Sequence, residues 1–286
     1  MKFRKAFSMI ELIFVIVIMG IIAKFGTEFL AESYKSFIFS KVNNKLQANS
    51  ATAVEFIASR LQHRIKDSVI AKKDASDFKA LANADDTYTI IEWVSSDADG
   101  FRGLDKPYWS GIIDVEHSDA TASLLISPET NTTLMNELID KLSYGDSNID
   151  SSAIYFIGSN SDINGYGWDG NALTDQEGVM HPIKAGTNEN EFEPAVEDFS
   201  GVDIYEYYKF AWTANALVVD DKNNLLFYYD YQPWNGDEYS DGKSAVIVQN
   251  VSTFRAMAIG AVMKIQVCVK SILVEEYSLC KEKTIF

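Results

Sequence analysis

Few residue patterns in this 286-residue chain are of a kind that carries chemistry, and the most suggestive one would bind a cation. The oxygen-bearing side chains spaced nearly as in a calcium loop are Asp162, Asn164, Asp169 and Asn171. A calcium loop closes with a bidentate Glu at its twelfth position, where this chain has Leu173. Calcium is therefore a weak hypothesis beside a solvated acidic turn. The segment from Asn235 to Asp241 is a second weak candidate, and no other metal or cofactor is expected.

Two further patterns begin like enzyme motifs and are not completed. Gly165 to Gly170 matches the GxGxxG pattern of dinucleotide sites, yet six residues separate it from the preceding strand-like run and no apolar helix follows it. The histidines His63, His117 and His181 have unlike neighbours, and no Ser, Cys or Thr lies in a recognised nucleophile motif. We expect a glycine-rich loop at 165–170 and no enzymatic activity.

One carboxylate interrupts a long apolar run near the N-terminus. Three cations, Lys2, Arg4 and Lys5, precede the residues 7–23, in which only Ser8 and Glu11 are polar. As a helix this run is roughly 25 Å long, and with residues 24–27 it approaches the ~30 Å of a bilayer core. The sequence therefore predicts a transmembrane segment at 7–27. A Glu at bilayer depth costs at least about 3 kcal/mol without a partner, so Glu11 requires an explanation.

The residues KAFSMIE followed by LIFVIVIMGIIA resemble the leader and N-terminal segment of type IV prepilins, the family of pilins and pseudopilins. The resemblance implies that a prepilin peptidase removes the basic leader 1–6 by cutting between Ala6 and Phe7, and that it methylates the new amine of Phe7. It also implies that Glu11, fifth in the mature chain, acts in assembly. Ala6 stands where the family usually has Gly.

The alternatives for this segment are an ordinary secretory signal and an unprocessed anchor. A secretory signal requires small residues after its apolar core, and residues 24–28 supply a poor cleavage site. The basic leader predicts a cytoplasmic N-terminus, so the rest of the chain lies across the membrane. In a bacterium this means a single-pass protein of the inner membrane with a periplasmic head.

The overall charge argues against one class of partner. The formal net charge is −16, or −19 without the three leader cations, and such a surface repels phosphate backbones. We expect no direct binding of nucleic acid. The resemblance instead implies three kinds of partner: other pilins or pseudopilins, prepilin peptidase and an inner-membrane assembly platform.

The remaining patterns predict an α+β fold. The chain from 24 to 70 has no Pro, so one helix is expected over 7–70, and it carries an apolar stripe that would pack on a sheet: Val54, Ile57, Leu61, Ile65 and Val69. A head at 71–286 follows, with a short helix at 134–142. Strands are expected at 88–94, 111–115, 122–127, 153–158, 207–219, 225–231, 245–249 and 261–269. Residues 159–200 are expected to form an irregular surface excursion. A long N-terminal helix packed on an antiparallel β-sheet is a pilin-like layout.

Two aromatic-rich runs, 205–212 and 227–234, could line a binding surface, but aromatic residues in strands belong to the core more often. The two cysteines, Cys268 and Cys280, fall in the exported part, where an oxidising compartment permits a disulfide; two buried free thiols are the alternative. We expect the strand ending near Cys268 to turn back through 271–276 so that 277–280 lies beside it. Type IV pilins commonly close a C-terminal loop with such a disulfide, which the resemblance adds.

The function expected from these patterns is that of a minor pilin or pseudopilin in a type II secretion, type IV pilus or DNA-uptake system. A head of this size would crowd a dense filament, which favours a position at or near a tip on the cell surface. The alternative is a membrane-tethered adhesin or ligand-binding module, in which the acidic loops of 159–200 recognise a ligand.

Overall fold

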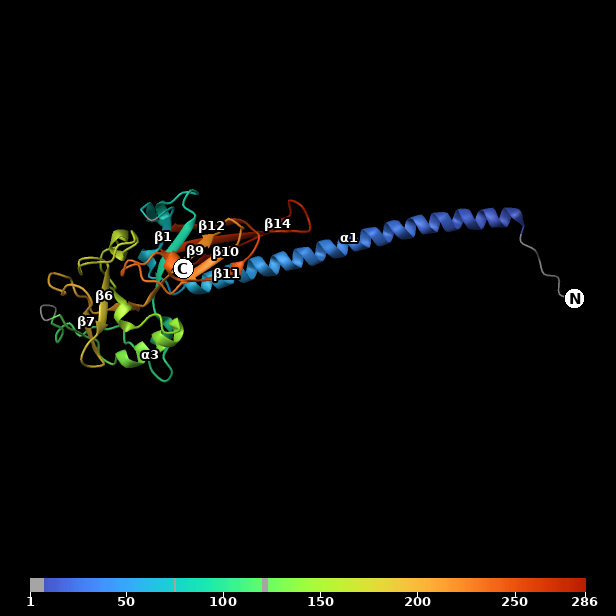
Figure 1. Ribbon diagram of the computed structural model, residues 1–286. Helices are drawn as coiled ribbons and strands as arrows, with labels where there is room; N and C mark the ends of the chain where they lie inside the picture. Colours follow the sequence, from blue (N-terminus) through green and yellow to red (C-terminus); the bar gives the residue numbers. More distant parts are fainter. Residues whose placement is uncertain (1–7, 75, 120–122) are drawn as a thin grey trace.

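The computed structural model describes residues 8–74, 76–119 and 123–286. A long helix, α1 (Met9–Leu61), projects from one side of a β-rich head, and the strands β6 and β7 lie at the end of the head farthest from the start of that helix (Figure 1). At about 1.5 Å per residue the 53 residues of α1 extend for about 80 Å. The fold is α+β, with a long apolar N-terminal helix followed by antiparallel sheets.

The helix α1 ends nine residues before the predicted boundary at residue 70. Its C-cap is Gln62, and the backbone then becomes extended, with φ −74° and ψ 116° at Ile65. The Ile65 N–H donates to the carbonyl of Val94 at 2.9 Å, and the chain joins a sheet at Ile70. Ile65 and Val69 are buried, but on an extended segment instead of a helix face. Strand pairing satisfies the backbone there, and β-branched side chains favour it.

The head contains three sheets, where the sequence predicts one. The six-stranded sheet has the order β11-β10-β9-β3-β1-β2, formed by β1 (Ile70–Lys72), β2 (Phe78–Ala80), β3 (Ile90–Ser95), β9 (Thr213–Val219), β10 (Leu225–Tyr229) and β11 (Lys243–Val248). The three-stranded sheet is formed by β12 (Val251–Ile259), β13 (Val262–Lys270) and β14 (Ser278–Ile285), in that order. All the strand pairings in the two sheets are antiparallel.

The third sheet is five-stranded and antiparallel, in the order β4-β7-β6-β5-β8. Its strands are β4 (Leu125–Ile126), β5 (Ala153–Phe156), β6 (Met180–Ala185), β7 (Glu191–Pro194) and β8 (Tyr208–Ala211). The helices of the head are α2 (Ala98–Arg102) and α3 (Thr132–Ser143), with 3-10 turns η1 (Lys66–Ser68), η2 (Leu81–Asn83), η3 (Ile149–Ser151), η4 (Ile163–Tyr166) and η5 (Tyr239–Asp241). The predicted helix at 134–142 is thus confirmed as α3.

The single strand predicted over 207–219 is two strands in different sheets. β8 pairs with β5, whereas β9 pairs with β3 and β10, so the chain passes from one sheet to another at Trp212. The predicted strand at 111–115 is reduced to one bridge between Ile112 and Tyr207. The strand predicted at 122–127 is reduced to β4, and residue 122 lies outside the described residues. The Ser127 hydroxyl donates to the Ile112 carbonyl at 2.9 Å, so a side chain replaces a ladder partner here.

The prediction of an irregular surface excursion at 159–200 is wrong at two places, one in each half of the segment. β6 lies between β5 and β7 at the centre of a sheet, and Tyr166 and Trp168 are buried. The sequence MHPIKA does not predict the strand β6, because it contains a His and a Pro, which are uncommon in central strands. Pro182 lacks an N–H, but its carbonyl still accepts from Ala195 at 3.0 Å.

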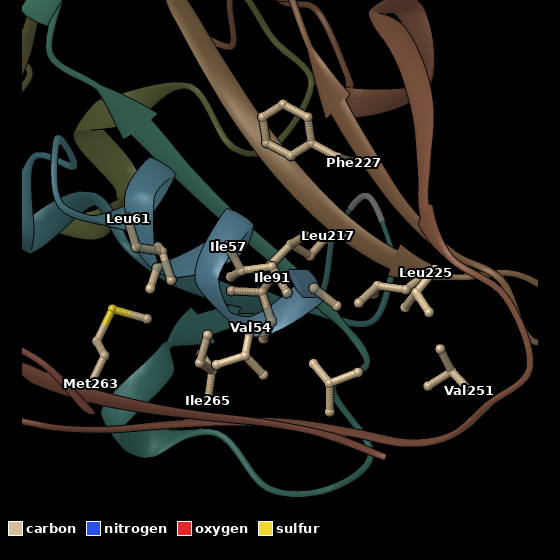
Figure 2. Packing of buried hydrophobic residues seen from close by; sticks show 14 of the residues in the cluster. Val54, Ile57, Leu61, Ile91, Leu217, Leu225, Phe227, Val251, Met263 and Ile265 are labelled. Carbon is tan, nitrogen blue, oxygen red and sulfur yellow. The ribbon is translucent and has the colours of Figure 1, made fainter. Parts of the chain in front are cut away.

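The end of α1 lies between two sheets. Figure 2 shows Val54, Ile57 and Leu61 among Ile91 and Leu217 of the six-stranded sheet and Met263 and Ile265 of the three-stranded sheet. These three helix residues are at most 3% exposed, and burying each contributes roughly 1.5–3 kcal/mol. An ion pair between Lys283 of β14 and Glu55 adds to this contact. The last third of α1 is therefore fixed to the head.

Half of the ten aromatic side chains in the runs 205–212 and 227–234 are buried, four more are partly buried, and that of Tyr207 is exposed, which favours the core interpretation. The buried ones are Tyr208, Phe210, Phe227, Tyr231 and Trp234. Tyr208 and Phe210 pack against Trp109 in the core behind the five-stranded sheet. These runs hold the sheets together and leave only a few aromatic side chains, such as that of Tyr207, on the surface.

Candidate functional site

The first turn of α1 is closed by a reciprocal cap. The Ser8 hydroxyl accepts from the Glu11 N–H at 3.3 Å, and Glu11 Oε2 accepts from the Ser8 N–H at 3.2 Å. Both residues are exposed, and the carboxylate sits at the positive end of the helix dipole. The predicted leader 1–6, the cleavage position Ala6 and the methylation position Phe7 lie outside the described residues. The structure places Glu11 in the first turn of α1.

Large apolar side chains are exposed along the whole of the first thirty residues of α1. In the described part of the chain, α1 is the one helix long and apolar enough to span a membrane. Exposure of large apolar side chains continues past the predicted span, through Phe29, Leu30, Tyr34, Phe37 and Phe39. Burial against the head begins at Val42. The helix thus has an exposed apolar part before Ile38, contacts the head first through Ile38 and Phe39, and is packed on it from Val42 onward.

A disulfide joins Cys268 of β13 to Cys280 of β14. The two residues are opposite one another in the strand register, with Cα atoms 3.9 Å apart. Residues 271–277 form the turn back that the sequence predicts. This bond closes a loop between β13 and β14, and that loop contacts α1.

The disulfide-closed loop contacts α1 at the point where the helix leaves the head. The Tyr277 hydroxyl donates to Asn43 Oδ1 at 2.8 Å, and the Tyr277 ring lies 5.0 Å from that of Phe39. Ile272 and Leu273 at the tip of the loop are exposed. The loop therefore braces the junction between the projecting and packed parts of α1.

The candidate calcium residues form hydrogen bonds within two local pairs. Asp162 Oδ1 accepts from the N–H and the side-chain amide of Asn164, at 3.0 and 2.8 Å. Asp169 accepts from Asn171 in the same way, at 3.1 and 3.0 Å. These are two separate local turns. Among residues 8–74, 76–119 and 123–286, there is no group of three or more His, Cys, Asp or Glu side chains that could hold a metal ion.

The segment 235–241 also uses its polar side chains locally. Asp237 Oδ2 accepts from the Gln232 N–H at 2.9 Å, and Asp241 Oδ2 accepts from the Glu238 N–H at 2.9 Å. The Asn235 side-chain amide donates to the Ser151 carbonyl at 3.0 Å. The carboxylates thus stabilise a turn.

The GxGxxG segment is a packed loop. Gly167 has φ +83°, and a Cβ there would lie 2.3 Å from the Pro233 carbonyl oxygen. Its neighbours Tyr166 and Trp168 are buried, and η4 is a short 3-10 turn instead of a helix start. The glycines allow close approach of two backbones, which leaves no phosphate-binding cradle at this loop.

The three histidines lie in different segments of the chain and differ in environment. His117 is exposed, with Nδ1 2.8 Å from Asp114 Oδ2, and His63 is exposed just after α1. His181 is buried on β6. Burial lowers the pKa of His181 to about 4, although a hydrogen bond with the backbone of Gln176 opposes this shift. Its ring is therefore neutral at pH 7.

Sequence reasoning missed a buried ion pair in the head. Lys72 Nζ lies 3.5 Å from Glu92 Oε1 and donates to the Trp168 carbonyl at 2.9 Å. The Tyr231 hydroxyl donates to Glu92 Oε2 at 2.8 Å. Burial raises the pKa of Glu92, while the charge of Lys72 and the hydrogen bond from Tyr231 lower it. The signal that could have found the pair is a lone Glu within the apolar run YTIIEWV.

The described residues thus form an exposed apolar helix and a head of three sheets. No protein-family model, no curated protein and no solved structure matches this chain.

Proposed function

We propose that this protein is a minor pilin or pseudopilin, a structural subunit of a type IV pilus-like filament, held in the bacterial inner membrane by residues 7–27. The observation that carries the proposal is the division of α1 near residue 40. On the N-terminal side of this division, exposed apolar side chains continue past residue 27, where the predicted membrane span ends. On its C-terminal side, the helix is packed on the head. Exposed aromatic side chains such as Phe29 and Phe37 need a protein partner outside the bilayer. Packing against the helices of other subunits supplies one.

The cap at the start of α1 supports a role for Glu11 in assembly. If the chain is cut before Phe7, the new amine lies one residue before Ser8. The hydrogen bonds between Ser8 and Glu11 hold the carboxylate at that end of the helix. Glu11 then pairs with the methylated amine of Phe7, its own or a neighbour's, and this pairing offsets the cost of a carboxylate in an apolar environment.

The head supports a minor subunit at or near a filament tip. It contains three sheets and all residues after α1, which is more bulk than a densely packed shaft accommodates. The pilin-like features are the helix packed between sheets and the disulfide that closes the C-terminal loop. In this proposal the head is periplasmic, and the partners are other pilins or pseudopilins, prepilin peptidase and an assembly platform. Type II secretion, a type IV pilus and DNA uptake are all compatible with it.

The first test is the mass of the native protein. Protein from cells with an active prepilin peptidase should begin at Phe7 and carry one added methyl group. Protein from cells with an inactive peptidase should retain Met1 and serves as the control. An intact Met1 in both strains would overturn the proposal.

The second test separates Glu11 from acidic residues in general. Glu11→Ala should sharply reduce the amount of subunit in sheared filaments, whereas Glu28→Ala should leave it near the wild-type level. Glu28 is the matched control because it is an exposed Glu on the same helix, 4.0 Å from Lys24. Normal assembly of Glu11→Ala would contradict the role given to this carboxylate.

A further inference from the structure

A groove of about 780 Å³ runs between α1 and one edge of the six-stranded sheet. One wall is a single face of α1, with Val42, Lys45 and Asn49 at helical spacing. The opposite wall is β11, and residues 269–273, which lead into the disulfide-closed loop, complete the lining. In Figure 1, β11 lies beside the part of α1 that is packed on the head.

The wall formed by β11 is an unpaired strand edge. β11 is the last strand of the six-stranded sheet, so among the described residues one of its edges has no neighbouring strand. Val246, Ile247 and Val248 are consecutive, and all three line the groove. Successive side chains of a strand point to opposite faces of a sheet, so consecutive lining residues indicate that the groove follows the edge.

The strand register shows which backbone groups of β11 point away from the sheet. The hairpin between β9 and β10 closes with a hydrogen bond from the Asp220 N–H to the Asn224 carbonyl at 2.9 Å. Hydrogen-bonded pairs alternate along an antiparallel ladder, so Leu226 bonds to β9, and Val246 opposite it points its N–H and C=O away from β10. Ser244 has the same orientation. In the described part of the chain, no hydrogen bond reaches these outward groups.

This edge lacks most of the features that keep strand edges from pairing. Proteins protect such edges with Pro, with charged side chains or with a covering segment. β11 contains no Pro, and its one charged residue, Lys243, is bound to Asp146 and Asp230. Val246 is 53% exposed. An edge of this kind can accept an added strand, whose backbone supplies the missing hydrogen bonds.

The groove has the length and the walls that a short strand requires. Residues 42–52 of α1 extend for about 15 Å along it. Five residues of a strand cover about 16 Å. Ile272 and Leu273 line the groove and are exposed, so they offer apolar contacts to alternate side chains of an added strand.

The charge of the groove selects among partners. Lys45 and Lys270 line it, are exposed, and form no ion pair with any described residue. No Asp or Glu is among the described residues that line it. A second copy that paired its β11 with this one would bring two more lysines to the same place, and like charges would repel. A segment that carries carboxylates would pair with both lysines.

We propose that β11 accepts an extended, acidic segment of a partner protein as an added strand. The backbone of this segment bonds to Ser244 and Val246, its alternate apolar side chains contact the walls, and its carboxylates pair with Lys45 and Lys270. The proposal does not depend on the filament role, because it concerns the head and is tested on the isolated protein. For a filament subunit, it would add a contact through the head to the contact through α1.

The test uses full-length protein in a neutral detergent and isothermal titration calorimetry with the peptide acetyl-TVEVEVT-amide. The peptide acetyl-TVKVKVT-amide has the same strand propensity and the opposite charge. We expect the acidic peptide to bind with a Kd below ~1 mM, at least about fivefold more tightly than the basic peptide, and more weakly as salt is added. Lys45→Gln and Lys270→Gln should each weaken binding about two- to fivefold. Lys41→Gln is their control, because Lys41 is an exposed lysine of α1 that does not line the groove.

Two substitutions of one residue test the backbone pairing. Val246→Pro removes the outward N–H and leaves the ladder with β10, so binding should weaken at least about tenfold. Val246→Thr keeps the N–H and should bind as the wild type does. Any of three results would overturn the proposal: no binding at ~1 mM acidic peptide, equal binding of the basic peptide, or equal affinity of the two Val246 variants. A wild-type dimer that Val246→Pro converts to a monomer in sedimentation analysis would also overturn it, because the occupant would then be a second copy.

Discussion

The buried pair of Lys72 and Glu92 gives the sharpest prediction about the head. Lys72 on β1 is opposite Ile90 of β3 in the strand register, so Glu92 is its diagonal neighbour. Both side chains are at most 3% exposed, and Lys72 also bonds to the Trp168 carbonyl in the loop before β6. Replacing Lys72 by Met keeps an unbranched apolar stem and removes the cation. The buried carboxylate then keeps only the hydrogen bond from Tyr231.

The expected loss of unfolding free energy depends on whether the unpaired carboxylate of Glu92 takes up a proton. Breaking a buried ion pair typically costs about 3–5 kcal/mol. Glu92 can limit that cost by taking up a proton, which for an ordinary pKa near 4.3 requires about 4 kcal/mol at pH 7 and about 1 kcal/mol at pH 5. Burial already raises the pKa of Glu92, and loss of Lys72 raises it further. Lys72→Met should therefore lower the unfolding free energy by about 3–4 kcal/mol at pH 7 and about 1 kcal/mol at pH 5.

The reciprocal variant has the opposite pH dependence. In Glu92→Gln, Lys72 is the orphan, and neutralising a lysine with an ordinary pKa near 10.4 costs about 5 kcal/mol at pH 7 and about 2 kcal/mol at pH 9. Folded Lys72→Met holds a proton that the unfolded chain lacks, so its stability recovers as pH falls. Folded Glu92→Gln lacks a proton that the unfolded chain holds, so its stability recovers as pH rises.

Urea unfolding of the full-length protein in neutral detergent, followed by tryptophan fluorescence at pH 5, 7 and 9, measures these differences. Lys141→Met is the control, because Lys141 and Glu137 form an exposed pair at 3.6 Å on α3; its loss should stay below about 0.5 kcal/mol at every pH. The double variant Lys72→Met/Glu92→Gln should lose less than the two single losses added together. Additive losses, or the same pH trend in both single variants, would refute the reasoning.

Three further predictions concern other parts of the head. Burial raises the pKa of Asp97 to about 6, so the wild type should lose about 2–3 kcal/mol of unfolding free energy as the pH rises from 4 to 6.5. Asp97→Asn should lack that loss when unfolding is measured across the same range. Gly167→Ala should cost at least about 2 kcal/mol more than Gly201→Ala in the same unfolding assay; both have φ +83°, but only at Gly167 would a Cβ meet backbone, at 2.3 Å. Alkylation without reductant should label neither Cys268 nor Cys280, and labelling of both in protein from the native compartment would rule the bond out. The double variant Cys268→Ser/Cys280→Ser should lower the unfolding free energy by about 2–3 kcal/mol.

Local patterns in the sequence predicted the elements with strong periodicity and failed where pairing partners are distant. The helix stripe through Leu61 was predicted correctly, but Ile65 continues the same spacing and is extended, because Val94 of β3, 29 residues later, offers its backbone a partner. The run 207–219 is continuous in composition, yet Trp212 divides it between two sheets. β6 was missed because its only sequence signal is a short apolar run around His181 and Pro182.

Glu11 and Glu92 illustrate how one sequence signal has two structural solutions. Each is a single carboxylate within an apolar run, and burial without a partner would be costly in either place. For Glu92 the fold supplies the partners, because β1 brings Lys72 beside it and a loop brings Tyr231. For Glu11 the head is far along the helix, and among the described residues only Ser8 reaches it. An exposed carboxylate at the end of an apolar helix, with a single local partner, is what a subunit needs if its final partner arrives only on assembly.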